Sequence, residues 1–363
     1  MPRWPSFTKP WALILGREVS DVFVVQGWQV LDGTVRFRGH LLVPPETAMT
    51  VLTPRLQPLG FIPMLQSSGE IVLVRLPGAR RIPGGWKGWP LNLALFLATL
   101  GTTLFVGAVM EGVSPLQQPT SILAGVPFSA SLLLILGCHE LGHYLTARSY
   151  GVQVSLPYFV PLPLPPMGTM GAIIRMRSPI PNRKVLFDIG ISGPLLGLVV
   201  AIPVLVLGLI LSPIKPLSGV VLQEGNSLAY LFLKWLLKGP IPAGSDVMLH
   251  PMAMAGWLGF FVTALNLLPL SQLDGGHIAY ATIGPRFRKV VWVFLGALVV
   301  LFLVSRWEGW LVWVVLTVIL GLRHPPPLDD LTPLDPSRRR LSMVALILLV
   351  TLLPPLPFAF LQV

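Results

Sequence analysis

Long apolar runs constrain this chain more than any other feature of its sequence. Beyond residue 90, they alternate with short polar segments. A helix needs about 20 apolar residues to cross the hydrocarbon core of a bilayer. Only 11% of all residues are charged, whereas soluble proteins average about 25%. The chain is therefore predicted to be a polytopic α-helical membrane protein with about six to seven transmembrane helices.

The expected spans follow these apolar runs. Residues 290–322 are interrupted near their middle by Arg306 and Glu308. We therefore expect a hairpin of two thin spans there instead of one long helix. Residues 226–238 are expected to form a helix on the membrane surface. The other expected spans are residues 91–110, 121–148, 184–212, 251–270 and 341–361.

The first 85 residues have the pattern of a small soluble α/β module. Residues 21–25 and 35–38 read as strands, and residues 61–64 with 71–74 read as a hairpin. A basic linker follows, rich in glycine and proline and carrying two tryptophans, which is typical of an interfacial anchor. The predicted divisions are the module at 1–85, the linker and first span at 86–120, a membrane core at 121–290 and C-terminal helices at 291–363.

Basic residues are distributed unevenly between the two predicted sides of the membrane. If the N-terminus is cytoplasmic and every span crosses, all but four of the 26 Lys and Arg residues lie on the cytoplasmic side. The exceptions are Lys215, Lys234, Lys238 and Arg306. The net charge of +11 thus reflects orientation and not a nucleic-acid partner. We predict a multi-pass protein of the bacterial cell membrane with a cytoplasmic N-terminus.

One apolar run, residues 131–148, carries the sequence HELGH at 139–143. Histidines four residues apart lie one turn apart on the same face of a helix. Two imidazoles in this arrangement can bind one Zn²⁺, and a glutamate after the first histidine can act as general base. Ionisable residues inside a membrane span are costly and indicate a functional site. His139 and His143 are therefore candidate zinc ligands, and Glu140 is the candidate base.

A catalytic zinc usually has three protein ligands and one open position. Asp274 is a candidate for the third ligand, because it follows an apolar span and precedes two glycines that allow close backbone packing. His277 lies one helical turn later and is the alternative. The residue types favour Asp274 but leave His277 open.

Residues 151–177 are apolar but rich in proline and glycine, which excludes a regular helix. Irregular apolar backbone at membrane depth must be buried in protein or line a cavity. We expect a re-entrant loop or hairpin beside the metal site, with a strand at 171–177. The alternative is an ordinary cytoplasmic loop.

Four segments in a fixed order resemble the site-2 protease family of intramembrane zinc metalloproteases. The resemblance covers about residues 121–290. Neither the PDZ nor the CBS domain of many relatives is evident in this sequence, and its N-terminal module makes it similar to the subgroup found in cyanobacteria and chloroplasts. The segments are HELGH at 139–143, GTMGA at 168–172, SGPLLG at 192–197 and NLLPLSQLDGG at 266–276.

The resemblance implies that His139, His143 and Asp274 bind zinc and that Glu140 is the base. It further implies that Asn266 polarises the substrate carbonyl or steadies the oxyanion. It also implies that the GTMGA segment belongs to a membrane-embedded hairpin that binds substrate. The residues of that segment are Gly168, Thr169, Met170, Gly171 and Ala172.

We therefore predict a zinc endopeptidase that cuts membrane-protein substrates within or near a transmembrane helix. Its expected partners are these substrates and the lipid bilayer, with no nucleic acid and no prediction of oligomeric state. An ion or metal transporter is an alternative, but it would need polar residues along several spans, and residues 91–110 are almost wholly apolar. A non-catalytic membrane scaffold is a second alternative, against which the intact Glu140 argues.

Overall fold

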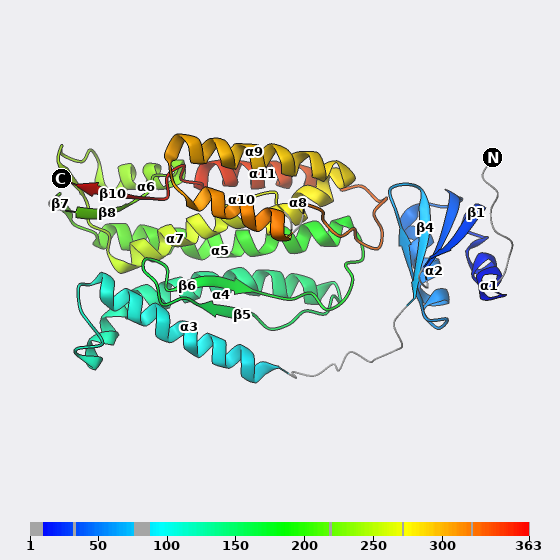
Figure 1. The fold of residues 1–363 in the computed structure, drawn as a ribbon, viewed down its shortest axis with the longest axis horizontal. Coiled ribbons are helices and arrows are strands. Elements are labelled where there is room, and N and C mark those ends of the chain that lie inside the picture. The colour runs from blue at the N-terminus through cyan, green and yellow to red at the C-terminus, as the bar shows by residue number, and fades with distance from the viewer. Residues whose placement is uncertain are drawn as a thin grey trace.

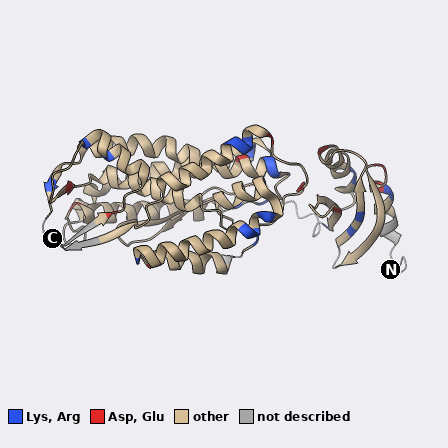
Figure 2. Cartoon of the chain, turned by 90° about the horizontal axis from the view of Figure 1, so that it is seen from above, with Lys and Arg blue, Asp and Glu red and all other residues tan. Residues whose placement is uncertain are grey.

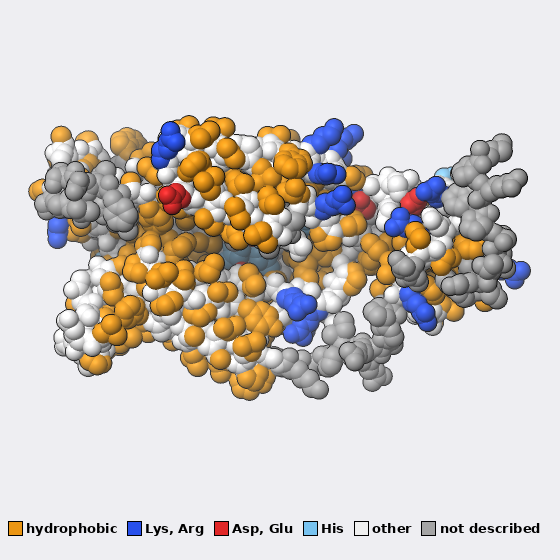
Figure 3. Space-filling model, viewed as in Figure 1, with side chains coloured by type: hydrophobic (Ala, Val, Ile, Leu, Met, Phe, Trp, Pro, Cys, Tyr) orange, Lys and Arg blue, Asp and Glu red, His pale blue; other side chains and the backbone are white. Residues whose placement is uncertain are grey.

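The computed structural model describes residues 10–31, 34–75, 88–217, 220–270, 272–320 and 322–362. It consists of a helical part and a smaller N-terminal part that lies beyond one end of the helices (Figure 1). Apolar side chains cover most of the visible face of the helical part (Figure 3). The predicted linker anchor lies mostly outside the described residues.

The N-terminal part contains a four-stranded antiparallel sheet with strand order β1-β2-β4-β3. The predicted hairpin at 61–74 is confirmed by the pairing of Phe61 with Arg75 and of Leu65 with Ile71. The helix over residues 10–19 was not predicted. The elements are α1 Pro10–Val19, β1 Phe23–Leu31, β2 Thr34–Leu41, α2 Pro45–Leu56, β3 Phe61–Leu65 and β4 Glu70–Arg75.

Four helical stretches of the described chain are long and apolar enough to cross a membrane. Two of them combine consecutive elements, because a short 3-10 turn leads into α4 and another joins α8 to α9. Three of the stretches match predicted spans to within a few residues. The elements are α3 Trp89–Met110, η1 Pro119–Gly125 with α4 Val126–Ser149, α5 Arg183–Leu211, and α8 Asp274–Ile283 with η2 Gly284–Arg286 and α9 Phe287–Ser305.

Three further apolar helices are shorter, namely α7 Pro251–Asn266, α10 Gly309–Leu320 and α11 Pro336–Leu352. The chain breaks between α9 and α10 at Arg306, whose φ of 59° is left-handed. The prediction that residues 290–322 form two helices is thereby confirmed. Helix α5 packs between α4 and α7, and these three helices contain most of the larger hydrophobic core.

The prediction of a final span at residues 341–361 is wrong at its C-terminal end. Helix α11 stops at Leu352, and prolines at positions 354, 355 and 357 exclude further helix. Residues Phe358–Gln362 instead form strand β10, which pairs antiparallel with β8, Val220–Glu224. The Phe358 ring packs against Trp257 of α7 at a centroid distance of 5.0 Å.

The proline-rich segment after α4 forms the predicted hairpin. Strands β5, Tyr158–Pro161, and β6, Thr169–Ile173, pair antiparallel with a register shift at Phe159. The pairing continues beyond β6, because Ser155 N–H donates to Arg175 O at 2.9 Å and Arg177 N–H donates to Gln153 O at 2.7 Å. The hairpin lies beside α4 and α3 (Figure 1).

The opposite end of the helices carries short strands and one amphipathic helix. The helix predicted at 226–238 is confirmed as α6, Leu228–Lys238, which begins with Ser227 as its cap, while its place on the membrane surface stays a prediction. Strands β7, Ile214–Pro216, and β9, Ser245–Val247, pair beside it. Lys and Arg residues are more numerous at the end of the helical part that faces the N-terminal part (Figure 2).

Candidate metal centre

Helix α4 places both histidines of the HELGH segment on one face, as their spacing predicts. The Nε2 atoms of His139 and His143 are 3.2 Å apart. Both side chains and Glu140 are buried, each with no more than 5% exposure. The helix interior supplies this geometry directly, since residues one turn apart project in nearly the same direction.

Asp274, the first residue of α8, completes the group. Its Oδ2 lies 3.1 Å from His139 Nε2 and its Oδ1 lies 3.2 Å from His143 Nε2. Among the described residues, these three side chains form the group that offers three metal-ligand atoms, all within 4.8 Å of one another. Chain segments that are 131 or more residues apart in sequence thus meet at one point.

The donor atoms fit a tetrahedral Zn²⁺. Two atoms that each lie about 2.0–2.1 Å from such an ion are about 3.3 Å apart. The observed separations of 3.1 and 3.2 Å between the carboxylate oxygens and the imidazole nitrogens are close to this value. Two imidazoles and one carboxylate are also a ligand set that catalytic zinc sites use.

A hydrogen bond at Nδ1 fixes the orientation of the His143 imidazole. His143 Nδ1 lies 2.7 Å from the carbonyl oxygen of Ile189 on α5. The carbonyl can only accept, so Nδ1 carries the proton and Nε2 presents its lone pair to the centre of the group. A neutral imidazole in this tautomer is ready to bind a metal.

Two glycines, one of which also makes room for the His143 ring, allow helices α4 and α5 to approach closely. A Cβ at Gly193 on α5 would lie 2.1 Å from His143 Nε2. A Cβ at Gly142 on α4 would lie 2.6 Å from the carbonyl oxygen of Ser192. The helices α4 and α5 can therefore approach closely only because both positions lack a side chain. This close approach explains why a glycine follows the glutamate by two residues.

Asn266 lies at the last residue of α7 and lines the same cavity as the metal-binding group. Its Nδ2 is 3.4 Å from His139 Nε2. The cavity has a volume of about 140 Å³ and also contains Glu140. The amide thus lies beside the metal-binding group.

His277, the alternative third ligand, does not join the group. Its Nδ1 lies 2.6 Å from Nε2 of His324, a residue of the loop after α10, while its side chain still lines the cavity. His324 was not singled out in the sequence, and a histidine before three prolines carries no spacing signal. Tyr280 stacks on the His324 ring at a centroid distance of 4.6 Å.

The GTMGA residues differ in their relation to the cavity. Ala172 lines it, whereas the Met170 side chain is 70% exposed. Thr169 is buried and its hydroxyl donates to Val160 O across the hairpin at 2.8 Å. Gly168 and Gly171 both have positive φ. Residues 173, 174 and 176, just beyond the segment, line the cavity more fully; they lie in the strand that the sequence predicted at 171–177.

Known proteins with similar sequences agree with this geometry. Residues 127–304 match peptidase family M50. Probable zinc metalloprotease EGY2, chloroplastic, of Arabidopsis thaliana is 29% identical, with 94% of this chain and 63% of the relative covered. Probable zinc metalloprotease EGY1, chloroplastic, of the same plant is 31% identical over 75% of this chain and 54% of the relative. The EGY2 protein of Oryza sativa subsp. indica is 28% identical, covering 94% and 64%.

The chain spans somewhat less than two thirds of the length of these relatives. The matched family region includes both histidines, Glu140, Asn266 and Asp274, and the four helical stretches suited to crossing a membrane include α4, α5 and α8 of the same region. Residues 127–304 of this chain are therefore a peptidase family M50 domain of the site-2 protease type, and the chain is homologous to the EGY zinc metalloproteases of chloroplasts.

Proposed function

We propose that this chain is a zinc-dependent intramembrane endopeptidase that hydrolyses a peptide bond within or near a transmembrane segment of its substrates. The observation that carries the proposal is the convergence of His139, His143 and Asp274 beside Glu140 in one buried cavity. In this proposal the two histidines and Asp274 hold zinc. Glu140 is not one of the three ligands, so its carboxylate remains available for proton transfer.

Each residue then has a distinct chemical task. A zinc ion bound by the three ligands would lower the pKa of a coordinated water and polarise the substrate carbonyl. Glu140 accepts the proton of the attacking water at its carboxylate and passes it to the leaving amine nitrogen. Asn266 donates its amide N–H to the carbonyl oxygen as negative charge develops there. The burial of both histidines and Glu140 strengthens these interactions.

A substrate helix cannot react while its carbonyls are engaged in helical hydrogen bonds. We propose that the substrate unwinds locally and lies extended along the hairpin strand that contains Gly168, Thr169, Met170, Gly171 and Ala172. Backbone groups on the open edge of such a strand can pair with an extended peptide. Ala172 and the residues after it are the part of this strand that reaches the cavity.

For the membrane topology, we propose seven spans, namely α3, α4, α5, α7, α9, α10 and α11, with a cytoplasmic N-terminus and the metal centre toward that side. The pairing of β8 with β10 supports this count, because it requires residues 220–224 and 358–362 to lie on the same side. Two crossings between residues 287 and 320 satisfy this requirement, and one crossing does not. We also propose the domain boundaries after residues 85, 120 and 290. The location in the bacterial cell membrane is likewise a proposal.

The two alternatives have less support. A transporter would need further ionisable groups along the spans, and the described part of α3 has none. A scaffold would not need Glu140 beside three metal-ligand atoms in one cavity.

The proposal is tested by incubating the purified chain with a labelled membrane-protein substrate in neutral detergent, then identifying the products by mass spectrometry. We expect one or a few cuts within or next to the substrate's transmembrane segment, with loss of cleavage after chelation and recovery with zinc. Cleavage that is indifferent to chelation, or confined to soluble loops far from the membrane segment, would refute the proposal.

A further inference from the structure

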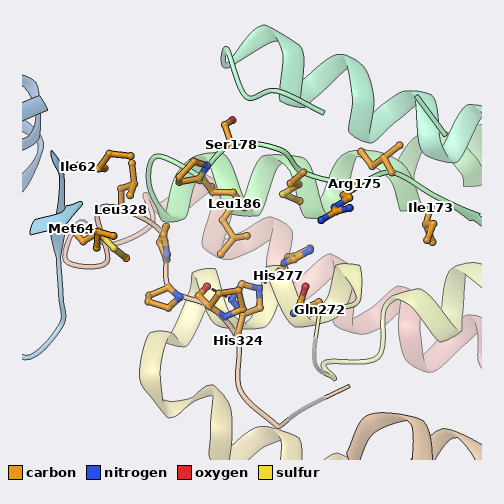
Figure 4. Close-up of a pocket in the computed structure, with 18 of the residues that line it drawn as sticks. Ile62, Met64, Ile173, Arg175, Ser178, Leu186, Gln272, His277, His324 and Leu328 are labelled. Atoms are coloured by element: carbon orange, nitrogen blue, oxygen red, sulfur yellow. Dashed lines mark hydrogen bonds between the residues drawn. The ribbon is translucent and has the colours of Figure 1, made fainter. Parts of the chain in front are cut away.

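A second and larger pocket lies between the helical part and the N-terminal sheet. Its volume is about 900 Å³, and we name it the module pocket. Figure 4 shows the residues of β3, such as Met64, on one side, Arg175 and Ser178 of the hairpin segment on another, and His277 and His324 on the third. Nothing in the proposed chemistry at the metal requires this space.

The wall from the N-terminal part is unusually apolar for an edge strand. In β3, Phe61 and Leu65 point into the core of the sheet's own module, as alternation requires. Ile62 and Met64 point the other way, are half-buried and line the module pocket. An edge strand facing water would carry polar side chains on that face. The face is therefore built to contact something apolar.

The opposite wall is held in a fixed position by the strap, which we define as residues 324–330. Leu65 N–H donates to Leu328 O at 2.7 Å, and Leu328 N–H donates to Ile180 O at 2.9 Å. The strap is thus a short shared strand between the N-terminal sheet and the start of α5. An ion pair between Arg183 and Asp330, at 2.8 Å, also holds the strap against the start of α5.

The module pocket is continuous with the metal-site cavity. Both are lined by Ile173, Ile174 and Met176 of the hairpin segment, and by Gln272 and His277 around the start of α8. A peptide that reaches the metal along the hairpin therefore runs into the module pocket on leaving the cavity. The main-chain bonds of Arg175 and Arg177 to residues 153–155 occupy one edge of this segment, so such a peptide would lie along the other edge.

Among the described residues that line the module pocket, one side chain is charged at neutral pH, which is Arg175. Its side chain is exposed, and among the described residues it has neither an ion pair nor a hydrogen bond. The rest of the described lining is apolar or neutral, with no acidic residue to neutralise the guanidinium. A ligand that is apolar over most of its length and has one acidic group matches this lining.

We propose that the module pocket binds the juxtamembrane segment of the substrate on the side of the N-terminal module, as an extended apolar peptide with an acidic side chain that pairs with Arg175. The inference rests on the proposed protease function and gives the N-terminal module a role in substrate selection. The continuity of the two cavities supports a segment of the substrate as the occupant, since the same chain must pass through both.

The test measures binding without cleavage. Full-length protein carrying Glu140→Gln is placed in nanodiscs of neutral lipid, and a fluorescein-labelled peptide of Leu, Ile and Val with one central Glu is titrated by anisotropy. A peptide with Lys in place of Glu is the matched ligand. We expect the Glu peptide to bind at least about fivefold more tightly than the Lys peptide. Arg175→Glu should reverse that preference.

Arg177→Glu is the control, because this arginine lies two residues further along the same segment, is exposed and does not line the module pocket. It should leave the preference unchanged. A peptide preference that survives Arg175→Glu, or no binding of either peptide, would overturn the proposal. In a further outcome, anionic lipid displaces the Glu peptide from protein with Arg175 intact but not from the Arg175→Glu variant. That result would assign the pocket to a lipid headgroup and would also overturn the proposal.

The wall of the module is tested separately. Ile62→Ser with Met64→Ser should weaken both peptides by about tenfold while leaving the charge preference intact. The matched control is Leu42→Ser with Leu59→Ser, two exposed leucines of the same module outside the pocket. Equal effects of the two pairs would refute a role for the module. Because binding is measured on the Glu140→Gln protein, intact binding without cleavage by wild type would refute the protease function alone.

Discussion

Two buried clusters of ionisable side chains lie in different parts of this molecule, and they differ in one respect. At the metal centre, two histidines and Asp274 converge with no cationic side chain among them. At the far end, Glu224 and Asp246 surround Lys234, whose Nζ lies 2.6 Å from Asp246 and 3.6 Å from Glu224. The second cluster supplies its own cation, whereas the first requires one from outside.

The far cluster is satisfied within the protein. Tyr230 O–H donates to Glu224 at 2.6 Å, and Gln223 donates to Asp246 at 2.7 Å. Burial raises the pKa of Glu224. Burial alone would also raise the pKa of Asp246, but hydrogen bonds from Lys234 and Gln223 lower it below its ordinary value. Such a cluster stabilises the loops around α6 and needs no ligand.

The largest expected contrast between the clusters concerns zinc. Asp274→Ala should reduce bound zinc from about one ion per chain to less than about 0.1, with loss of cleavage, because two ligands hold the metal far more weakly than three. Asp246→Asn should leave both unchanged. Measuring the zinc content of the two purified variants checks this prediction. Zinc retained in Asp274→Ala would show that the metal-site cluster does not differ from the far cluster in its need for a metal.

The next prediction concerns the space that Gly193 leaves for the His143 side chain. Gly193→Ala keeps all three ligands but places a Cβ about where His143 Nε2 now lies, at 2.1 Å. We expect cleavage to fall by about 10- to 100-fold, with weaker zinc binding in competition with a chelator. Gly137→Ala is the control, since a Cβ there meets nothing within 4 Å. Similar affinities in the two variants would show that α5 does not position the histidine.

Removing the positive charge of Lys234 should lower the stability of the protein but leave cleavage activity unchanged. Lys234→Met leaves the buried Glu224 and the half-buried Asp246 without a cationic partner, and we expect a loss of about 3–5 kcal/mol in the free energy of unfolding. Zinc content and cleavage by the folded fraction should not change. Lys238→Met, on the same helix but outside the cluster, removes only a hydrogen bond from Nζ to the Ile210 carbonyl oxygen and should cost no more than about 1 kcal/mol. Thermal unfolding in detergent distinguishes the two, and equal stabilities would show the far cluster to be dispensable.

The smallest effect is on pH dependence. The pKa of Asp246 is lowered in the folded protein, so its charge contributes stability that is present above the unfolded value of about 3.9 and lost as the pH falls below it. Asp246→Asn should therefore lose less stability than wild type between pH 5 and pH 3 (roughly the range around that pKa). Melting temperatures measured across this range provide the comparison, and parallel curves would contradict it.

The sequence predicted local features well because helical period and proline chemistry act over short distances. The spacing of His139 and His143 fixes their common face whatever surrounds them. The two helices within residues 290–322 follow from the polar residues near Arg306, and the end of α11 could have been read from Pro354 and Pro355. The helix at residues 10–19 lacks a comparable signal.

Long-range contacts were not accessible in the same way. Asp274 was favoured over His277 mainly by a family resemblance, since both follow the same span and periodicity does not separate them. The contact of His277 with His324 joins residues 47 apart in sequence. The module pocket depends on Met64, Arg175 and the strap, which no local pattern connects. These features arise from packing between elements, which a single sequence does not specify.

The central claim is that the metal-site cluster binds zinc for catalysis with Glu140 as base and not as ligand. The most direct measurement is zinc content together with the cleavage rate in Glu140→Gln, which keeps the shape of the side chain and both histidines. Removing a general base typically costs about 10²- to 10⁴-fold in rate. The account predicts zinc near about one ion per chain with cleavage reduced by that factor. Near-normal cleavage, or loss of zinc together with activity, would contradict it.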